Sequence, residues 1–283
     1  MPHPDGRLSL QFEYDATNAR TLLHVAEQRQ PLKVVRAFQT ESGAALAHIH
    51  NLSGGILAGD RLSLDMEIGS KAQAQVTSTG ATRLYRNRAG TAAAEFTARA
   101  SVRAGALLEY LPDPLIPFAD SRFHQDTVIN LEDSAGLFWW ETVAPGREAH
   151  GEMFSYGALR FRFDLRAEGI PIALERSDLD PRERPLESSA RLGPYRYFSS
   201  FYVCRVGTGE NTWRGLEKQF RALAGTLSSA VIIWGLGRLQ AHGLVVRALS
   251  QNGRDIPSGL ISFWRVAKQA LYGQDAVIPR KVY

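Results

Sequence analysis

Five carboxylates stand among apolar residues in segments with strand-like patterns: Asp60, Glu109, Glu141, Glu152 and Glu175. A buried carboxylate costs free energy unless it is ion-paired, hydrogen-bonded, metal-bound or hydrated. Pairing with an arginine is one interpretation of this set. An internal polar passage and an acid/base pair are the others, because carboxylates transfer protons and also hold divalent cations in an exchangeable way.

His48 and His50 form a weaker candidate site in a segment, residues 44–50, that we expect to be a strand. Alternation along a strand places both imidazoles on one face, where they could contact a metal ion. Two ligands need a third, so we predict no fixed metal site and no tightly bound cofactor. Partly exposed histidines on a polar strand face are the simpler interpretation.

Several function classes lack their sequence signals. There is no G-x-S-x-G, Walker A, H-E-x-x-H or EF-hand motif. The lone Cys204 excludes an intrachain disulfide or thiolate cluster. The 33 Lys and Arg residues are interleaved with 29 Asp and Glu residues rather than gathered in a stripe, so we expect no nucleic-acid partner. We also expect a cytoplasmic chain without a membrane partner, since no leader or long apolar run is evident.

A glycine loop, Gly54-Gly55-Ile56-Leu57-Ala58-Gly59-Asp60, precedes a clearly alternating segment, residues 62–68. Glycines permit a positive φ angle or a close backbone approach at little steric cost. Since the loop leads into a strand and not into a helix, no helix N-terminus would face a bound phosphate. The next strand, residues 72–79, carries hydroxyl and small side chains, which indicates a requirement other than bulk burial.

The elements that must position these residues are mainly strands. A turn followed by a small residue recurs at residues 69–72, 104–106 and 133–135, a spacing of roughly 30 residues that is typical of stacked β-units. We therefore predict a single domain, residues 1–283, of stacked β-sheet layers, with amphipathic helices only at residues 211–224 and 258–272. Alternation predicts strands at residues 8–17, 21–26, 34–38, 44–50, 62–68, 72–79, 92–102, 107–111, 121–130, 135–142, 159–165, 172–179, 231–234 and 243–248.

Six motifs occur in order along nearly the whole chain. They are GGILAGD at 54–60, STGATRLYR at 78–86, LEYLPDPLIPF at 108–118, ETVAPGREAHGEMF at 141–154, LERSDLD at 174–180 and VIPRKVY at 277–283. Each motif is weak alone, but the ordered set resembles the UreD family of urease accessory proteins, also called UreH. Arg83 stands where that family often has lysine, and Ala58 where it often has glycine.

The resemblance implies a non-enzymatic cytoplasmic protein that joins UreF and the GTPase UreG on urease apoprotein and helps deliver nickel, which it holds only transiently. It implies a largely β fold with helix-like (β-helix-type) strand winding and two helices. It also implies an internal polar route for nickel, with Asp60, Thr82, Glu141 and Glu175 as its candidate residues. Two alternatives remain: a hydrolase or lyase that uses Glu141 and Glu152 as acid and base, and a pure adaptor without an ion route.

Overall fold

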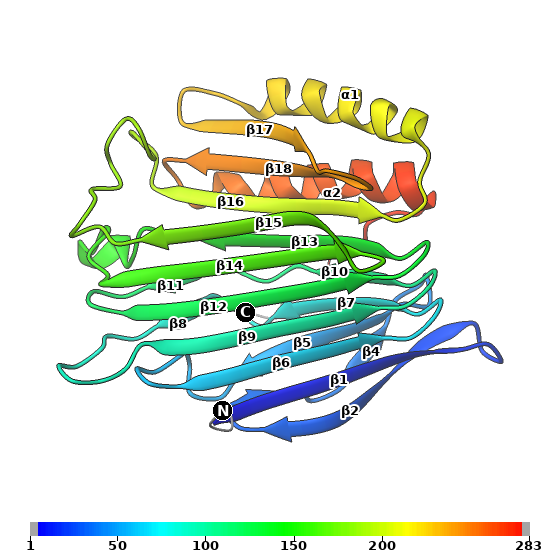
Figure 1. Ribbon diagram of the computed structural model, residues 1–283, viewed down its shortest axis with the longest axis horizontal. Helices are drawn as coiled ribbons and strands as arrows, with labels where there is room; N and C mark the ends of the chain where they lie inside the picture. The colour runs from blue at the N-terminus through cyan, green and yellow to red at the C-terminus, as the bar shows by residue number, and fades with distance from the viewer. Residues whose placement is uncertain (1–4, 279–283) are drawn as a thin grey trace.

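The computed structural model describes residues 5–278, which form eighteen β-strands in two sheets, two α-helices and a short 3-10 helix, η1 (Glu148–His150). The two sheets lie one behind the other, and the helices lie against one end of the rear sheet (Figure 1). Residues 279–283, which complete the motif VIPRKVY, lie outside the described residues. Neither of the described α-helices has an apolar stretch long enough to cross a membrane.

The front sheet, here sheet A, contains the long strands that face the reader in Figure 1. Its order is β15 (Ile170–Leu179), β14 (Ala158–Ala167), β12 (Arg122–Leu131), β9 (Ala94–Val102), β6 (Arg61–Ile68), β1 (Gly6–Asp15) and β2 (Arg20–Arg29).

The rear sheet, here sheet B, is the larger of the two. Its order is β17 (Ile232–Arg238), β18 (Gly243–Ser250), β16 (Tyr197–Arg205), β13 (Gly136–Val143), β10 (Leu107–Tyr110), β7 (Gln73–Ser78), β5 (Ala45–Asn51) and β3 (Leu32–Lys33), with the short strands β4 (Ala37–Gln39), β8 (Thr82–Leu84) and β11 (Leu115–Pro117) beside it.

The chain winds between the sheets as a solenoid. From β6 it passes to β7, returns to β9, passes to β10, returns to β12, passes to β13 and returns to β14, so each coil adds one strand to each sheet. Neighbouring coils pair in parallel, as in β6 with β9 and β7 with β10. The predicted mainly β fold with helix-like winding and two late helices is therefore confirmed.

The recurring turns of the sequence are the tight corners of this solenoid. Lys71, Gly105 and Ser134 occupy equivalent positions on successive coils, and all three have a positive φ angle, of 64°, 69° and 57°. The corners stack through backbone hydrogen bonds, such as Gly105 N to Asp133 O at 3.0 Å. The next residue on each coil is a buried alanine, which lets the corner close against its neighbours: Ala72, Ala106 and Ala135.

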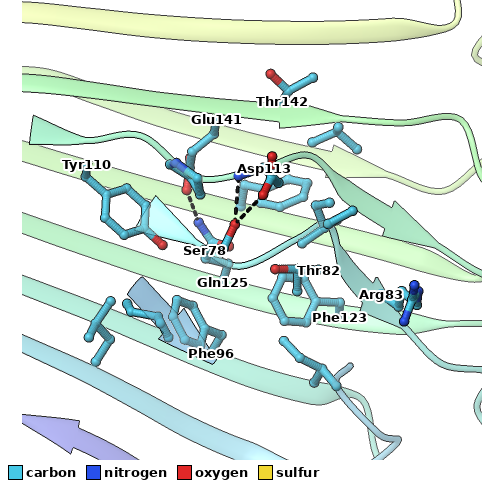
Figure 2. Close-up of a pocket in the computed structure, with 18 of the residues that line it drawn as sticks. Ser78, Thr82, Arg83, Phe96, Tyr110, Asp113, Phe123, Gln125, Glu141 and Thr142 are labelled. Atoms are coloured by element: carbon cyan, nitrogen blue, oxygen red, sulfur yellow. Dashed lines mark hydrogen bonds between the residues drawn. The ribbon is translucent and has the colours of Figure 1, made fainter. Parts of the chain in front are cut away.

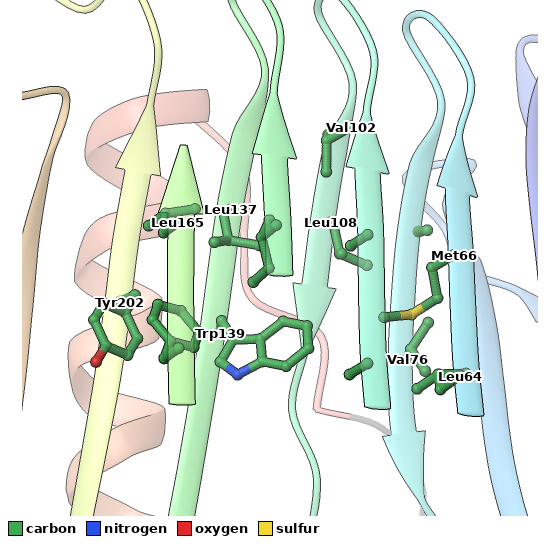
Figure 3. Close-up of a cluster of buried hydrophobic side chains, with 14 of the residues drawn as sticks. Leu64, Met66, Val76, Val102, Leu108, Leu137, Trp139, Leu165 and Tyr202 are labelled. Atoms are coloured by element: carbon green, nitrogen blue, oxygen red, sulfur yellow. The ribbon is translucent and has the colours of Figure 1, made fainter. Parts of the chain in front are cut away.

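The middle strands β10, β13 and β16 of sheet B are buried on both faces, which gives the protein two apolar cores. One core lies between the sheets and includes Leu64, Leu137 and Trp139 (Figure 3). The other lies between sheet B and the helices α1 (Glu210–Leu227) and α2 (Asp255–Tyr272), and includes Phe138. Because side chains alternate along a strand, adjacent residues of β13 enter different cores.

One predicted strand, residues 34–38, is correct only at residues 37–38, which belong to β4. β3 ends at Lys33 and β4 begins at Ala37, and the residues between them are not in a ladder. The physical reason is local: the Val34 N–H donates to the side-chain Oε1 of Gln28 at 2.8 Å, instead of to a neighbouring strand.

Candidate functional site

A cavity of about 480 Å³ lies between the two sheets and crosses the coils. Its lining extends from Leu32 and Ile49, near one end of the solenoid, to Tyr202 and Arg247 near the other. Aromatic and aliphatic side chains line it together with a comparable number of polar ones. The polar side chains of the lining include Ser78, Thr82, Tyr110, Asp113, Gln125, Glu141, Glu175, Ser200, Tyr202 and Arg247.

Glu141 projects into this cavity from sheet B. It follows Trp139 on the face of β13 that looks toward sheet A, and Gln125 of β12 donates a hydrogen bond to its Oε1 from the opposite sheet (Figure 2). Burial raises the pKa of the Glu141 carboxyl to about 7; the Gln125 hydrogen bond opposes this rise, and the charge of Glu175 adds to it. Near neutral pH this group is therefore divided between its charged and neutral forms.

Glu175 reaches the same cavity from β15, at the edge of sheet A. It accepts a hydrogen bond from Nη2 of Arg247 on β18, and Nη1 of Arg247 donates to Ser200 Oγ at 2.7 Å. The arginine thus bridges the two sheets. Burial and the neighbouring Glu175 carboxylate raise the pKa of Tyr202, which keeps this phenol neutral.

Thr82 also lines the cavity, at the start of β8 (Figure 2). Its backbone N–H donates to Pro114 O at 3.0 Å, which fixes the strand beside β11. Close by in the lining, Ser78 Oγ donates to Asp113 Oδ2 at 3.2 Å and accepts from Asp113 N at 2.8 Å. The structure therefore brings Thr82, Glu141 and Glu175 to one cavity.

Asp60 occupies a different position. Within the described part of the chain, it is not among the residues that line the cavity. Its Oδ2 accepts the Leu57 N–H at 2.8 Å and so closes the end of the glycine loop. The other end of the loop does line the cavity, and Gly55 has no room for a side chain there, because a Cβ would lie 2.6 Å from Arg83 O.

The two histidines lie on the face of β5 that looks away from the cavity. Ala47 and Ile49 face the core between the sheets, and His48 and His50 alternate with them. The His48 ring contacts Phe38 edge-on, with centroids 5.7 Å apart. Among residues 5–278, no group of three or more His, Cys, Asp and Glu side chains has the arrangement of a metal site.

The remaining two carboxylates are structural ion pairs. Glu152 binds Arg147, accepts the Ala119 N–H at 3.1 Å, and has its pKa lowered to about 2, chiefly by the arginine hydrogen bond. It is absent from the described lining of the cavity that holds Glu141. Glu109 points to the opposite face of sheet B, where it pairs with Lys268. The arrangement does not bring Glu141 and Glu152 together as an acid/base pair.

Sequence reasoning missed Gln125, Asp113 and Arg247. Gln125 had a usable signal, because it interrupts the inward apolar series of β12 and is 8 % exposed. Arg247 had one too, since it stands inside the apolar run LVVRAL of β18. The contact between Arg247 and Glu175 joins segments 72 residues apart, and no local pattern reports it.

Comparisons with known proteins find relatives along nearly the whole chain. The family model described as UreD urease accessory protein matches residues 4–283. A urease accessory protein UreD from Herpetosiphon aurantiacus is 43% identical over 279 residues, which cover 98% of this chain and 96% of that protein. Those from Pseudomonas aeruginosa and Nitrosococcus oceani are 33% and 32% identical, and cover 98% and 96% of this chain and 95% and 88% of their own lengths. The chain belongs to the UreD family of urease accessory proteins.

Proposed function

We propose that this protein is a non-enzymatic scaffold and conduit in urease maturation. It acts in the cytoplasm with UreF-like and UreG-like proteins on the urease apoprotein, and nickel is its cargo. The observation that carries the proposal is the cavity across the coils, whose lining includes Thr82, Glu141 and Glu175. Family membership supports the maturation role.

Oxygen donors that are spread along a cavity suit transfer better than storage. A closed set of several strong ligands would trap a transition-metal ion, whereas isolated carboxylate and hydroxyl oxygens release it. Further oxygen donors of the wall, Ser78, Asp113 and Thr142 among them, line the same cavity and could take part in successive transfers. The short Gln125 to Glu141 contact keeps one carboxylate at a fixed place along the passage.

The experiment compares inward and outward carboxylates of the same protein during urease activation. Glu141→Gln and Glu175→Gln should lower urease activity and the nickel content of purified urease several-fold, while the accessory complex still co-purifies. Asp178→Asn is the matched control, because Asp178 lies on β15 with Glu175 but is 65 % exposed and pairs with Arg160 outside the cavity.

The outcomes separate the proposed conduit from its alternatives. Normal nickel loading in both inward variants, with the complex intact, would leave a pure adaptor and refute the conduit. Loss of the complex in the inward variants alone would assign these glutamates to assembly instead of transfer. Turnover of a small substrate by the isolated chain, abolished by Glu141→Gln, would support the hydrolase or lyase.

A further inference from the structure

Glu175, one of the carboxylates in the cavity lining, is paired with a positively charged side chain of the protein itself, Arg247. Arg247 donates to Glu175 across the gap between β18 and β15 and to Ser200 on the adjacent strand β16. In the ladder of sheet B, Glu141 lies opposite Ser200, and Ser200 lies opposite Arg247. Glu141 and Arg247 are therefore two strands apart in sheet B, with Ser200 between them, and the guanidinium contacts Glu175.

This contact differs from the ion pairs on the outer face of sheet A. Those pairs, such as Arg162 with Asp126, join side chains that are 70 % and 53 % exposed. Glu175 is 29 % exposed and lines the cavity, whereas Arg247 is 49 % exposed. The arginine therefore has space to leave its partner, but the carboxylate remains inside.

A guanidinium and a metal ion compete for the same carboxylate oxygens. Arginine holds a carboxylate through charge-assisted hydrogen bonds and stays protonated at any working pH. A divalent cation that approached Glu175 would also meet the positive charge of Arg247 at close range, and like charges repel. The cation can coordinate Glu175 fully only after the guanidinium has moved.

We propose that Arg247 is a displaceable counter-ion that closes the β15–β18 end of the cavity and lowers the affinity of Glu175 for divalent cations. In the cation-free protein it neutralises a half-buried carboxylate of the cavity lining. When a cation arrives, the side chain swings toward solvent. The meaning of this device for nickel transfer rests on the proposed function, but the competition itself is a property of the chain.

The test measures Ni²⁺ binding by the full chain, produced without a polyhistidine tag, in competition with a chromophoric chelator. R247Q should bind Ni²⁺ about tenfold more tightly than the wild type, which corresponds to about 1.4 kcal/mol. R247K, which keeps the charge but loses the planar fork, should fall between them. The double variant R247Q/E175Q should lose the gain, and R162Q, on the outer face, should match the wild type.

Equal Ni²⁺ affinity in R247Q and the wild type, or a gain that survives in R247Q/E175Q, would overturn the proposal. Folding of each variant is checked by thermal unfolding, and R247K keeps the test valid if R247Q does not fold. This result is independent of the conduit itself. Tighter binding by R247Q, together with normal nickel loading of urease in Glu141→Gln and Glu175→Gln, would support the counter-ion and refute the conduit. Unchanged binding by R247Q, together with reduced nickel loading in those two variants, would support the conduit and refute the counter-ion.

Discussion

Lys268 of α2 lies with its Nζ 2.9 Å from Oε2 of Glu109 on β10, and both side chains are only 3 % exposed. Trp264, one turn earlier on α2, donates to the other carboxylate oxygen at 2.8 Å. This buried pair connects the helix layer to sheet B. On the same strand, Tyr110 faces the cavity, so neighbouring residues of β10 serve the fold and the candidate site separately.

Replacing Glu109 by Gln should destabilise the protein by about 3–5 kcal/mol, because it leaves the Lys268 ammonium buried without its counter-charge. Urea unfolding of the variant measures this loss. Glu109→Leu combined with Lys268→Met should recover most of it. Glu67→Gln, at an exposed pair with Arg103, should cost less than about 1 kcal/mol and serves as the control. A loss as small as the control's would contradict a structural role for the pair.

Glu141 should make the stability of the protein depend on pH. Since its folded-state pKa is raised from 4.5 to about 7, the folded state holds the proton more tightly than the unfolded state. The stability that this group contributes is therefore fully present below pH 4.5 and is lost as the pH rises to about 7. Relative to the wild type, Glu141→Gln should gain on the order of 1–3 kcal/mol between these values.

The measurement is urea unfolding of the wild type and Glu141→Gln at pH 5 and pH 8. Asp126→Asn is the control, because Asp126 lies on the exposed face of β12 and is 53 % exposed. A difference in free energy of unfolding that is the same at both pH values would show that Glu141 does not titrate in this window.

Gln125→Met should raise the pKa of Glu141 further, because it removes the hydrogen bond that favours the charged carboxylate. We expect a loss of about 1–3 kcal/mol in unfolding free energy at pH 8, where the unpaired charge must be buried, and a smaller loss at pH 5. The same loss at both pH values would mean that Gln125 acts through packing alone.

Gly55→Ala should destabilise the protein by about 1–3 kcal/mol, because the new methyl group would overlap Arg83 O and the Tyr85 ring. Gly215→Ala is the matched substitution at an exposed position within α1, where a Cβ meets no neighbouring atom. It should raise stability by about 0.5–1 kcal/mol. Thermal unfolding of both variants separates the steric effect at Gly55 from a general effect of alanine. Equal shifts in melting temperature would refute the steric effect.

The sequence predicts best where a strand has one polar and one apolar face. The alternation at residues 159–165 corresponds to β14, and that at residues 62–68 to β6. It gives no signal for β16, because Phe201, Tyr202 and Val203 are buried alike, on both sides of sheet B. Helix α2 begins at Asp255 rather than at Ser258, since Pro257 is tolerated in a first helical turn.

For the candidate site, the sequence motifs identify Thr82, Glu141 and Glu175, which share one cavity, but not the groups that control them. Nearby arginines are natural partners to consider, and Glu152 does pair with Arg147. Glu175 pairs with Arg247 of β18, and Glu109 pairs with Lys268 of α2. Both partners belong to elements that are distant in the sequence. Only the folded topology creates those contacts.

The winding of one strand per coil and sheet fixes the length of the cavity between the sheets. Strands in a sheet repeat at about 4.8 Å, so the distance between the two ends of the cavity changes only in whole multiples of that increment. A loop insertion would leave this span untouched, whereas gain or loss of a complete coil would lengthen or shorten it by one increment. The number of coils therefore sets the distance between the two ends of the cavity.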